Sequence, residues 1–599
     1  MTSNKYKFCA SVSALIIFFA TFLAYSNTFS VPFQFDDIAC IANNWRILHL
    51  EKIGELFRYW PTRFITYLTF AINYKIHNFN VTGYHIVNLL IHIGCGLLIW
   101  RIAKKIFSGM FENNMTTVVA LFSSLIFVLH PVQTQAVTYI YQRHTCLATL
   151  FVLSGFMCWI KVLERKENRW FWLIMCSIFA ILGMFTKEIA IIFPFLILMY
   201  FFWFRNRLNC VIKTWKVIFY SAFLFSIIPA TLLLAHGINI SELQSVSSMQ
   251  GPPGEIITRK DYFLTQGQAF LIYFKLIFLP LKQNLDYDIS ISKSFFSPPE
   301  TLVGFTLMLA VTLFCLLLFK KNKILSFSLA IYIISILPQS SLIPKPDLVV
   351  EHRLYLPLTG FALFLPSFLY YIARKTSVVT VFLIVLLCFY GIATYQRNNT
   401  WKDALTLWND TVSKSPNKAR PYLNRGLAYA EKSDIQNALR DYTMAIKINP
   451  WYVEAYNNRG ILFASIKNYQ QALSDFNKAI ELKVDYATAY NNRAVLYSSL
   501  NKWDTAIKDF DTALKLNPMY VDALKNRGIA FLVNKNIERA IQDFSTAIKI
   551  YPENGQLYFY RAVALLNRGD KKSATKDIMY AMKLGYPVPQ ALKKILNEQ

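Results

Sequence analysis

The chain has few acidic residues and lacks the cysteine patterns of metal sites and disulfide frameworks. Asp and Glu number 35, against 62 Lys and Arg. The Lys and Arg residues cluster at the ends of apolar segments, and no nucleic-acid recognition motif accompanies them. The nine Cys form no CxxC or Cys/His pattern. We therefore expect no nucleic-acid partner, no disulfide framework and no zinc site.

Polar sequence is scarce before residue 396, and hydrophobic residues make up 55% of the whole chain, with a mean hydropathy of +0.33. A soluble protein cannot bury that much apolar surface, so we predict a helical membrane domain over residues 1–398. The basic start, Met1–Lys7, and the apolar run after it predict a signal anchor, because no small-residue cleavage site follows. Apolar segments about long enough to span a bilayer lie at 8–29, 84–103, 116–130, 145–163, 170–185, 188–204, 217–236, 262–280, 301–319, 324–343, 354–373 and 377–396.

Basic residues between these segments predict the orientation of the domain. They cluster near 101–105, 161–169, 205–216, 320–323 and 374–375, and the positive-inside rule places these loops in the cytoplasm. Three apolar segments lie between 217 and 319, but only an even number of crossings keeps both basic flanks inside. We assign 262–280 as an interfacial or re-entrant helix, because Gln266, Gln268 and Lys275 interrupt it. Eleven crossings result, with the N-terminus in the cytoplasm and the C-terminus outside it.

A 34-residue repeat fills the C-terminal part of the chain. The period predicts a tetratricopeptide solenoid of five helix pairs over 419–599, so we expect an all-α chain. Small residues at the eighth repeat position, such as Gly426, let paired helices approach each other. Tyr442 and its equivalents at position 24 are expected to fill the core. Alanine recurs at the same spacing, at Ala438, Ala472, Ala506, Ala540 and Ala574.

Residues 399–418 form a degenerate half-repeat at the junction. Ala404 and Trp408 stand 34 residues before Ala438 and Tyr442. No Gly/Ser linker separates the domains. We therefore expect the last transmembrane helix to abut the first repeat and to hold the array.

An asparagine column occupies the sixth repeat position, which we expect on the concave side of the solenoid. Side-chain amides can bind an extended peptide backbone whatever its sequence. The alternative is that Asn-Arg-Gly is a repeat consensus without a ligand. We expect the following Arg to support packing between repeats and not to bind an anion. The column consists of Asn424, Asn458, Asn492 and Asn526.

The predicted external loops, 30–83, 131–144, 186–187, 237–300 and 344–353, carry unusual polar residues. Asp36 and Asp37 are either a solvated pair or a general base with a neighbour that orients an acceptor or holds a divalent metal. Such a combination of carboxylates and cations suits transfer from a lipid phosphate. The candidate phosphate-binding residues are Arg63, Arg143, Lys187, His352 and Arg353. Further active-site candidates are His130, Glu188, Asp286, Asp288 and Glu351.

An ordered set of strings carries a family resemblance. After the Asp36-Asp37 pair come GYHIVNLLIH (83–92), HPVQTQAVTYIYQR (130–143), TKEIAIIFPFLIL (186–198), FLPLKQNLDYD (278–288) and EHRLYLPLTGF (351–361). With the repeats that follow, they resemble the transmembrane-and-TPR O-mannosyltransferases and their bacterial relatives, which are GT-C membrane glycosyltransferases. The resemblance implies an inverting sugar transfer from a polyprenyl-phosphate donor to Ser or Thr hydroxyls. It also implies Asp36 or Asp37 as the base and Arg353 as a phosphate ligand.

The chain departs from the animal members of this group. It is shorter, has fewer repeats, and shows Gln133 and Gln135 where His and Glu are expected. It looks closer to the bacterial branch, so we predict a bacterial inner (cytoplasmic) membrane location and do not assume mannose as the sugar.

Three functions stay open at this point. The leading one is glycosylation of an extracytoplasmic protein, with an extended acceptor segment held by the repeats and membrane lipids around the helices. The second is sugar transfer to a lipid or an envelope glycan. The third is a non-catalytic scaffold or a transporter. The polar external clusters argue against a mere anchor, and the apolar segments carry few of the midplane charges that a transporter needs.

Overall fold

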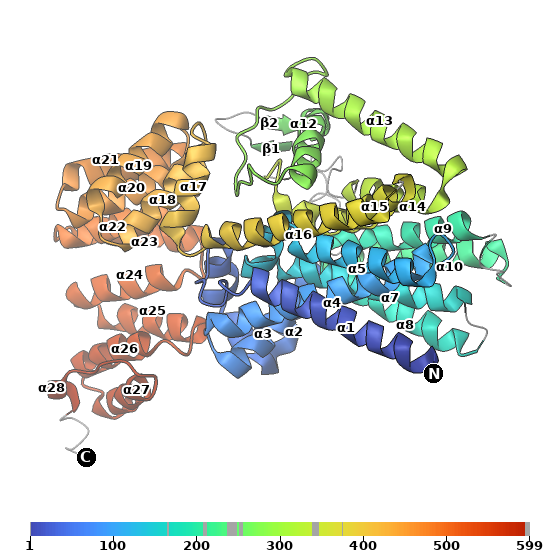
Figure 1. Ribbon diagram of the computed structural model, residues 1–599. Coiled ribbons are helices and arrows are strands. Elements are labelled where there is room, and N and C mark those ends of the chain that lie inside the picture. Colours follow the sequence, from blue (N-terminus) through green and yellow to red (C-terminus); the bar gives the residue numbers. More distant parts are fainter. Residues whose placement is uncertain are drawn as a thin grey trace. The chain divides into compact units, whose positions relative to one another are not determined.

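The fold is that of a computed structural model, which describes residues 2–164, 167–205, 207, 212–236, 248–250, 256–337, 345, 347–373 and 375–593. The chain divides into two compact units, Met1–Pro416 and Asn417–Gln599 (Figure 1). Arg165, Lys166 and Arg374 of the predicted basic loops lie outside the described residues, as do parts of the predicted loops 237–300 and 344–353.

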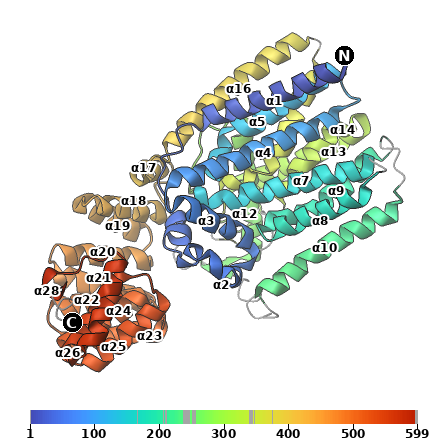
Figure 2. The same cartoon turned by 90° about the horizontal axis from the view of Figure 1, so that it is seen from below.

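The first unit consists mainly of long helices, and each predicted apolar segment coincides with one of them. Figure 2 shows α1 and α16 side by side, with their N-termini at the same end of the bundle. The long helices are α1 (Thr2–Ala24), α4 (Val81–Phe107), α5 (Asn113–Leu129), α7 (Arg143–Glu164), α8 (Arg169–Met184), α9 (Phe193–Phe204), α10 (Thr214–His236), α12 (Arg259–Phe278), α13 (Pro299–Lys321), α14 (Lys323–Ile336), α15 (Pro357–Ile372) and α16 (Thr376–Asn399).

Short elements join these helices. The stretch 30–83, predicted only as a loop, contains two helices, whose buried Leu56, Tyr67 and Phe70 form a small core with Ile41 and Tyr84. The short helices are α2 (Ile53–Tyr59), α3 (Phe64–His77), α6 (Thr134–Val137) and α17 (Ala404–Lys414). The unit also contains an antiparallel strand pair, β1 (Ser248–Gln250) and β2 (Ile256–Thr258). The remaining elements are a π-helical turn, η1 (Ile38–Ala42), and the 3-10 turns η2 (Trp45–Leu48), η3 (Leu50–Lys52), η4 (Pro61–Arg63), η5 (Pro131–Gln133), η6 (Ile140–Gln142), η7 (Glu188–Ile192) and η9 (Glu351–Leu354).

The predicted count of eleven crossings is not confirmed. By length and composition, four helices of the described chain can cross a membrane, at Val81–Phe107, Ile140–Glu164, Pro299–Lys321 and Thr376–Asn399. A fifth span results if α5 and the segment Pro131–Val137, bent by 49° from each other, act as one. The apolar stretches of the other helices, such as Ala10–Ala24 of α1 and Thr214–Ile227 of α10, have only 10–17 residues. Their sequences are apolar enough, but they are shorter than the roughly 20 residues that cross a bilayer core.

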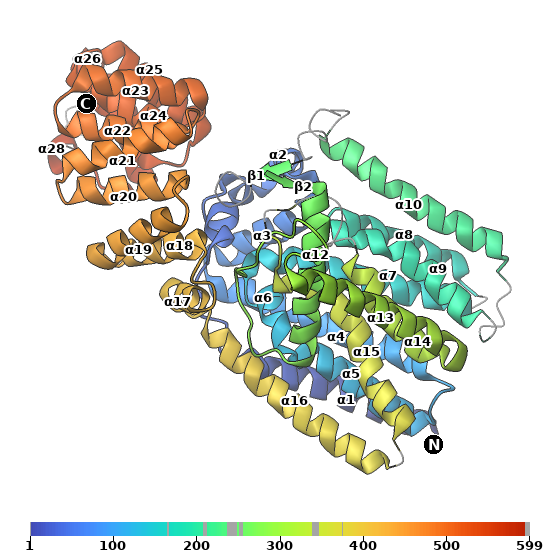
Figure 3. The ribbon, with the colours of Figure 1, turned by 90° about the horizontal axis from the view of Figure 1, so that it is seen from above.

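Helix α12, predicted as an interfacial or re-entrant helix, is not among the candidate spans. In Figures 1 and 3 it runs across the direction of α16. Its N-terminus carries a capping box in which the side chains of Thr258 and Asp261 each accept a backbone N–H. The interrupting Gln268 is buried, and its Nε2 donates to the Ser290 carbonyl at 2.9 Å. Gln268 therefore makes a contact inside the unit, whereas Lys275 is exposed, and the position of α12 in a membrane stays a prediction.

Three of the predicted basic loops meet at one end of the bundle. Lys105 Nζ lies 2.7 Å from Glu164 Oε2, which joins the end of α4 to the end of α7. The guanidinium of Arg207 donates to the Ile106 carbonyl at 2.8 Å. The loops grouped by the positive-inside argument are thus neighbours in space, while the side of the membrane on which they lie stays a prediction.

The second unit contains the five predicted helix pairs. Gly426 shows why position eight is small: a Cβ there would lie 2.6 Å from the ring of Tyr442, which is closer than a carbon contact allows. The pairs are α18 (Ala419–Glu431) with α19 (Ile435–Ile448), α20 (Val453–Ser465) with α21 (Tyr469–Leu482), α22 (Ala487–Ser499) with α23 (Trp503–Leu516), α24 (Val521–Val533) with α25 (Ile537–Ile550), and α26 (Gly555–Arg568) with α27 (Lys571–Lys583), followed by α28 (Gln590–Lys593).

An arginine–aspartate pair braces each repeat. In the third repeat, Arg493 donates from Nε and Nη2 to the two oxygens of Asp509, at 2.7 and 2.8 Å. Its Nη1 reaches Asn477 of the preceding repeat at 2.6 Å. The arginine therefore joins both helices of its own repeat and a helix of its neighbour, as expected for a packing residue. The same pairing occurs at Arg425–Asp441, Arg459–Asp475, Arg527–Asp543 and Arg561–Asp577.

The predicted half-repeat, α17, packs within the first unit. Arg397 at the end of α16 pairs with Asp410 at 2.7 Å. Lys414 donates to the Gln283 carbonyl at 2.7 Å, and Ser415 donates to the Asp286 carbonyl at 2.6 Å. This segment is therefore fixed to the loop 282–288 of the first unit.

Candidate active site

A polar cavity of about 350 Å³ lies in the first unit, at the end where the predicted external loops meet. It is built by five segments that are far apart in the sequence, and most of its side chains are charged. The lining residues are Asp36, Trp60, Arg63, Tyr141, Gln142, His144, Lys187, Glu188, Lys345, Asp347, Val350, His352 and Arg353. Its volume falls within the range of roughly 300–1,000 Å³ that is usual for small-molecule sites.

The two adjacent aspartates occupy different environments. Asp36 is half-buried and lines the cavity. Asp37 is buried, and its carboxylate accepts the backbone N–H groups of Gln34 at 2.9 Å and Tyr141 at 2.6 Å. Burial raises the pKa of Asp37 to about 8, against the lowering effect of these two N–H groups. The pair therefore divides into one carboxylate at the cavity and one that ties the loop to η6.

Cations from other segments of the chain line the same cavity. Lys187 is buried and donates to Thr145 Oγ1 at 2.6 Å. Burial and the nearby Arg63 lower the pKa of Lys187 well below its usual value. Glu188 pairs with Arg63 at 2.9 Å and with Lys345 at 3.0 Å. Nη1 of Arg63 is buried and has no hydrogen-bond partner among the described residues, which leaves a donor for an anion.

The turn η9 brings His352 and Arg353 to the cavity. Arg353 donates to the main-chain carbonyls of Leu348 and Asp347, at 3.0 and 2.6 Å, so it also holds the preceding segment in place. The backbone N–H of His352 donates to Gln135 Oε1 at 2.8 Å. Gln135, which stands where the resemblance leads one to expect Glu, is therefore a second contact that positions this turn.

Besides Asp37, five predicted site residues do not line the cavity. Arg143 is buried and makes its contacts inside the unit: Nε donates to Asn88 at 2.6 Å, and its other nitrogens bind Asn73, Thr69 and the Tyr84 carbonyl. No phosphate role follows from this arrangement, because the burial and the internal acceptors account for the side chain.

The other four are also placed elsewhere. Both ring nitrogens of His130 are used, at the Ile277 carbonyl and the Val132 N–H. Glu351 is buried and accepts from Gln283 and Tyr287, so it holds the loop 282–288. Asp286 is buried in that loop, and Asp288 is exposed.

Several cavity residues had no prediction attached to them. Tyr141 and Gln142 lie inside the string 130–143, and His144 follows it directly. The string that carries the family resemblance was therefore the one sequence feature that pointed to these three residues. Lys345 and Asp347 lie in the predicted loop 344–353, where no pattern separates them from ordinary solvated charges.

The aspartate pair does not fit a metal site. Among the described residues there is no group of three or more His, Cys, Asp or Glu that could hold a metal ion. The carboxylate of Asp37 is occupied by two backbone N–H groups, which leaves Asp36 as the one carboxylate of the pair at the cavity.

The asparagine column of the second unit lies along its row of first helices. Its amides are bonded to each other through a second asparagine in two repeats: Asn526 to Asn491, Asn491 to Asn492, Asn492 to Asn457, and Asn457 to Asn458, at 2.9–3.2 Å. Asn424 stands apart, because its Nδ2 donates to the Arg420 carbonyl. An amide such as that of Asn492 keeps one N–H and part of its acceptor capacity for a ligand.

Comparisons with known proteins match both units. The family described as dolichyl-phosphate-mannose-protein mannosyltransferase matches residues 64–232. Tetratricopeptide repeat families match 419–450 and 453–554. The structure of YrrB, titled a TPR protein with an unusual peptide-binding site, is 16% identical to this chain, covers 30% of this chain and 93% of its own, and has a TM-score of only 0.25.

Two curated relatives align with most of this chain. Protein O-mannosyl-transferase F38B6.6 of Caenorhabditis elegans is 24% identical over 460 residues, covering 73% of this chain and 63% of that protein. Protein O-mannosyl-transferase TMTC4 of Homo sapiens is 24% identical over 492 residues, covering 72% and 65%. The chain thus spans just under two thirds of the length of these relatives. The matches confirm the resemblance to transmembrane-and-TPR O-mannosyltransferases and, with the apolar helices, a membrane protein; both relatives are animal proteins, and the bacterial location stays a prediction.

Proposed function

We propose that this chain is an inverting membrane glycosyltransferase, which moves a sugar from a polyprenyl-phosphate donor to Ser or Thr hydroxyls of an extracytoplasmic protein. The observation that carries the proposal is the cavity, which is lined by the Asp36 carboxylate and by the cations Arg63, Lys187, Lys345 and Arg353. The similarity to named protein O-mannosyltransferases supports it.

The proposed chemistry uses the charges of the cavity directly. The Asp36 carboxylate takes the proton of the acceptor hydroxyl as its oxygen attacks the anomeric carbon. The bond between that carbon and the phosphate oxygen breaks, and the lipid phosphate leaves with the electron pair. Lys187 and the unpartnered Nη1 of Arg63 stabilise the charge that grows on the phosphate. Asp37 acts through the backbone, because it holds the N–H groups of Gln34 and Tyr141 beside Asp36.

The repeats are proposed to hold the acceptor. The amides of Asn458, Asn492 and Asn526 offer donors and acceptors along one row, in a spacing set by the repeats. An extended peptide backbone can use such a row without reading side chains. This mode suits an enzyme whose acceptor needs only an accessible hydroxyl in an unfolded segment.

The test is sugar transfer by the purified full chain in lipid, with polyprenyl-phosphate sugars as donors and a Ser/Thr-rich peptide as acceptor, read by mass spectrometry. We expect Asp36→Asn to lower kcat by roughly 10²- to 10⁴-fold, the usual contribution of a general base. Asp288→Asn is the matched control, since Asp288 is an exposed carboxylate outside the cavity. Full activity of Asp36→Asn would overturn the mechanism.

The same assay separates protein from lipid acceptors. Deletion of 419–599 should abolish transfer to the peptide, whereas an enzyme that glycosylates a lipid should keep its activity. Offering mannose, glucose and N-acetylglucosamine donors in parallel identifies the sugar. A protein that turns over none of these donors would fit the scaffold hypothesis.

A further inference from the structure

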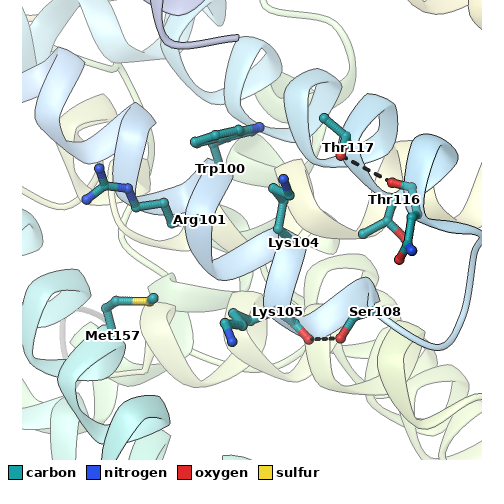
Figure 4. Close-up of a pocket in the computed structure, with 9 residues that line it drawn as sticks. Trp100, Arg101, Lys104, Lys105, Ser108, Thr116, Thr117 and Met157 are labelled. Atoms are coloured by element: carbon teal, nitrogen blue, oxygen red, sulfur yellow. Dashed lines mark hydrogen bonds between the residues drawn. The ribbon is translucent and has the colours of Figure 1, made fainter. Parts of the chain in front are cut away.

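A second pocket lies at the opposite end of helix α4 from the cavity. The first residues of α4 contact the loop that leads to Asp36, since His85 bonds to the Val31 carbonyl at 2.8 Å. At 27 residues the helix is about 40 Å long. The pocket, of about 440 Å³, is formed by the last turns of α4, the first turn of α5 and Met157 of α7 (Figure 4). It therefore lies at the end of the bundle that carries the basic loops.

The lining of this pocket is rich in donors. Arg101, Lys104 and Lys105 contribute positive charge, and the described residues that line it include no Asp or Glu. Lys105 is paired with Glu164 at 2.7 Å, which leaves Arg101 and Lys104 as the cations without an ion pair among the described residues. Asn113 begins α5, where the first backbone N–H groups have no partner within the helix and attract anions, whereas the N–H of Thr116 donates to the Glu112 carbonyl at 2.8 Å.

Trp100 supplies an independent sign of a ligand. Its side chain is only 6% exposed, and its Nε1 has no hydrogen-bond partner among the described residues. A buried indole N–H usually finds an acceptor. Figure 4 shows the indole nitrogen directed toward the α5 side of the pocket, where Thr117 lies. The ammonium of Lys104 lies 5.2 Å from the centre of the Trp100 ring, so both donors are close together.

We propose that this pocket binds the phosphate group of an anionic membrane lipid, with phosphate oxygens accepting from Trp100 Nε1 and Lys104 Nζ at the N-terminus of α5. The lipid is favoured over free phosphate because the pocket lies where the apolar helices end in basic residues. An exposed apolar side chain, Val118, follows Thr117 on the same helix. Basic pockets between membrane helices are suited to such headgroups. The proposal does not depend on the transferase function, because the pocket and the cavity share no residue.

The experiment uses the full chain in nanodiscs of phosphatidylcholine with a minor fraction of phosphatidylglycerol. Native mass spectrometry after extraction measures how much phosphatidylglycerol stays bound. We expect Lys104→Met and Trp100→Phe each to lower its apparent affinity about fivefold, the effect of losing one interfacial charge or one hydrogen bond. Lys104→Arg should keep the affinity. Lys161→Met is the matched control. The Lys161 ammonium also lies over a tryptophan, 3.6 Å from the centre of the Trp172 ring, but neither residue lines this pocket.

Two further arms decide between outcomes. A phosphatidylglycerol analogue with a photoreactive headgroup should label residues within 100–117 of the wild-type chain, a readout that needs no variant to fold. Inorganic phosphate added in excess should leave the lipid bound. The proposal is overturned by unchanged affinity in both Lys104→Met and Trp100→Phe, by labelling confined to other segments, or by full displacement of the lipid by inorganic phosphate.

Discussion

The arginine that braces the third repeat gives a prediction whose size follows from the structure. In Arg493→Met, the Asp509 carboxylate loses two hydrogen bonds of 2.7 and 2.8 Å while its side chain stays only 11% exposed. Removing one partner of a buried ion pair costs about 3–5 kcal/mol. Because the Arg493 side chain is 19% exposed and water reaches part of the pair, we expect about 2–3 kcal/mol.

Hydrogen exchange of the full chain measures this effect locally. Backbone amides of α22 and α23 should exchange roughly 30- to 150-fold faster in Arg493→Met, because tenfold corresponds to about 1.4 kcal/mol. Amides of α26 and α27 should change little, since repeats couple mainly to their neighbours. Arg440→Met, at an exposed arginine of α19, is the control.

A double variant tests the physical cause. Arg493→Met with Asp509→Asn leaves no unpaired charge, so it should be more stable than Arg493→Met alone by about 1 kcal/mol or more. If the double variant is as unstable as the sum of the two single changes, the burial of an uncompensated carboxylate is not the reason. An exchange rate in Arg493→Met within threefold of the wild type would also refute the reasoning.

Three further predictions concern the cavity and the asparagine column. Burial raises the pKa of Asp37 to about 8. We therefore expect kcat/KM to rise as the pH increases through about 8, because the ionised form accepts both backbone N–H groups. We also expect the free energy of unfolding to fall between pH 4 and 8, because the folded protein holds a proton that the unfolded chain, with a usual pKa of about 3.9, has lost. Both trends should vanish in Asp37→Asn, measured by pH–rate profiles and thermal unfolding. Gln135→Leu should lower kcat about tenfold, because His352 N–H loses its acceptor, whereas Gln135→Glu, which keeps an acceptor, should restore most of it; equal losses in both would contradict the positioning role. Asn492→Ala should raise the KM for the peptide about fivefold without changing that for the donor, with Asn437→Ala of α19 as the control, and an unchanged peptide KM would favour the repeat-consensus alternative.

The helices were predictable from the sequence because apolar length and a fixed repeat period are local properties. The number of crossings was not, because α8, α9, α14 and α15 are apolar but shorter than a bilayer span. The contents of the loop 30–83 were missed as well. Its helices α2 and α3 pack on Ile41 and Tyr84, and these contacts are not visible in a run of mixed polarity.

The candidate site was predictable only as a set of loops on one face. Six predicted residues line the same cavity, as expected if the external loops meet: Asp36, Arg63, Lys187, Glu188, His352 and Arg353. Arg143 and His130 lie in the same loops but have internal acceptors and donors, on Asn88 and Ile277, that no motif reveals. The different surroundings of Asp36 and Asp37 depend on Tyr141, more than a hundred residues away.

The chain of amides from Asn526 to Asn458 has a polarity. Between repeats, the donor always belongs to the more C-terminal repeat: Asn526 donates to Asn491, and Asn492 donates to Asn457. If a single amide were rotated by 180°, its oxygen would face a neighbouring oxygen and its nitrogen a neighbouring nitrogen. The amides therefore all have the same orientation, or all reverse it together. A bound peptide would therefore meet the same order of donors and acceptors at each repeat. Only one of its two directions along the row matches that order, so a peptide and its reversed sequence should differ as acceptors.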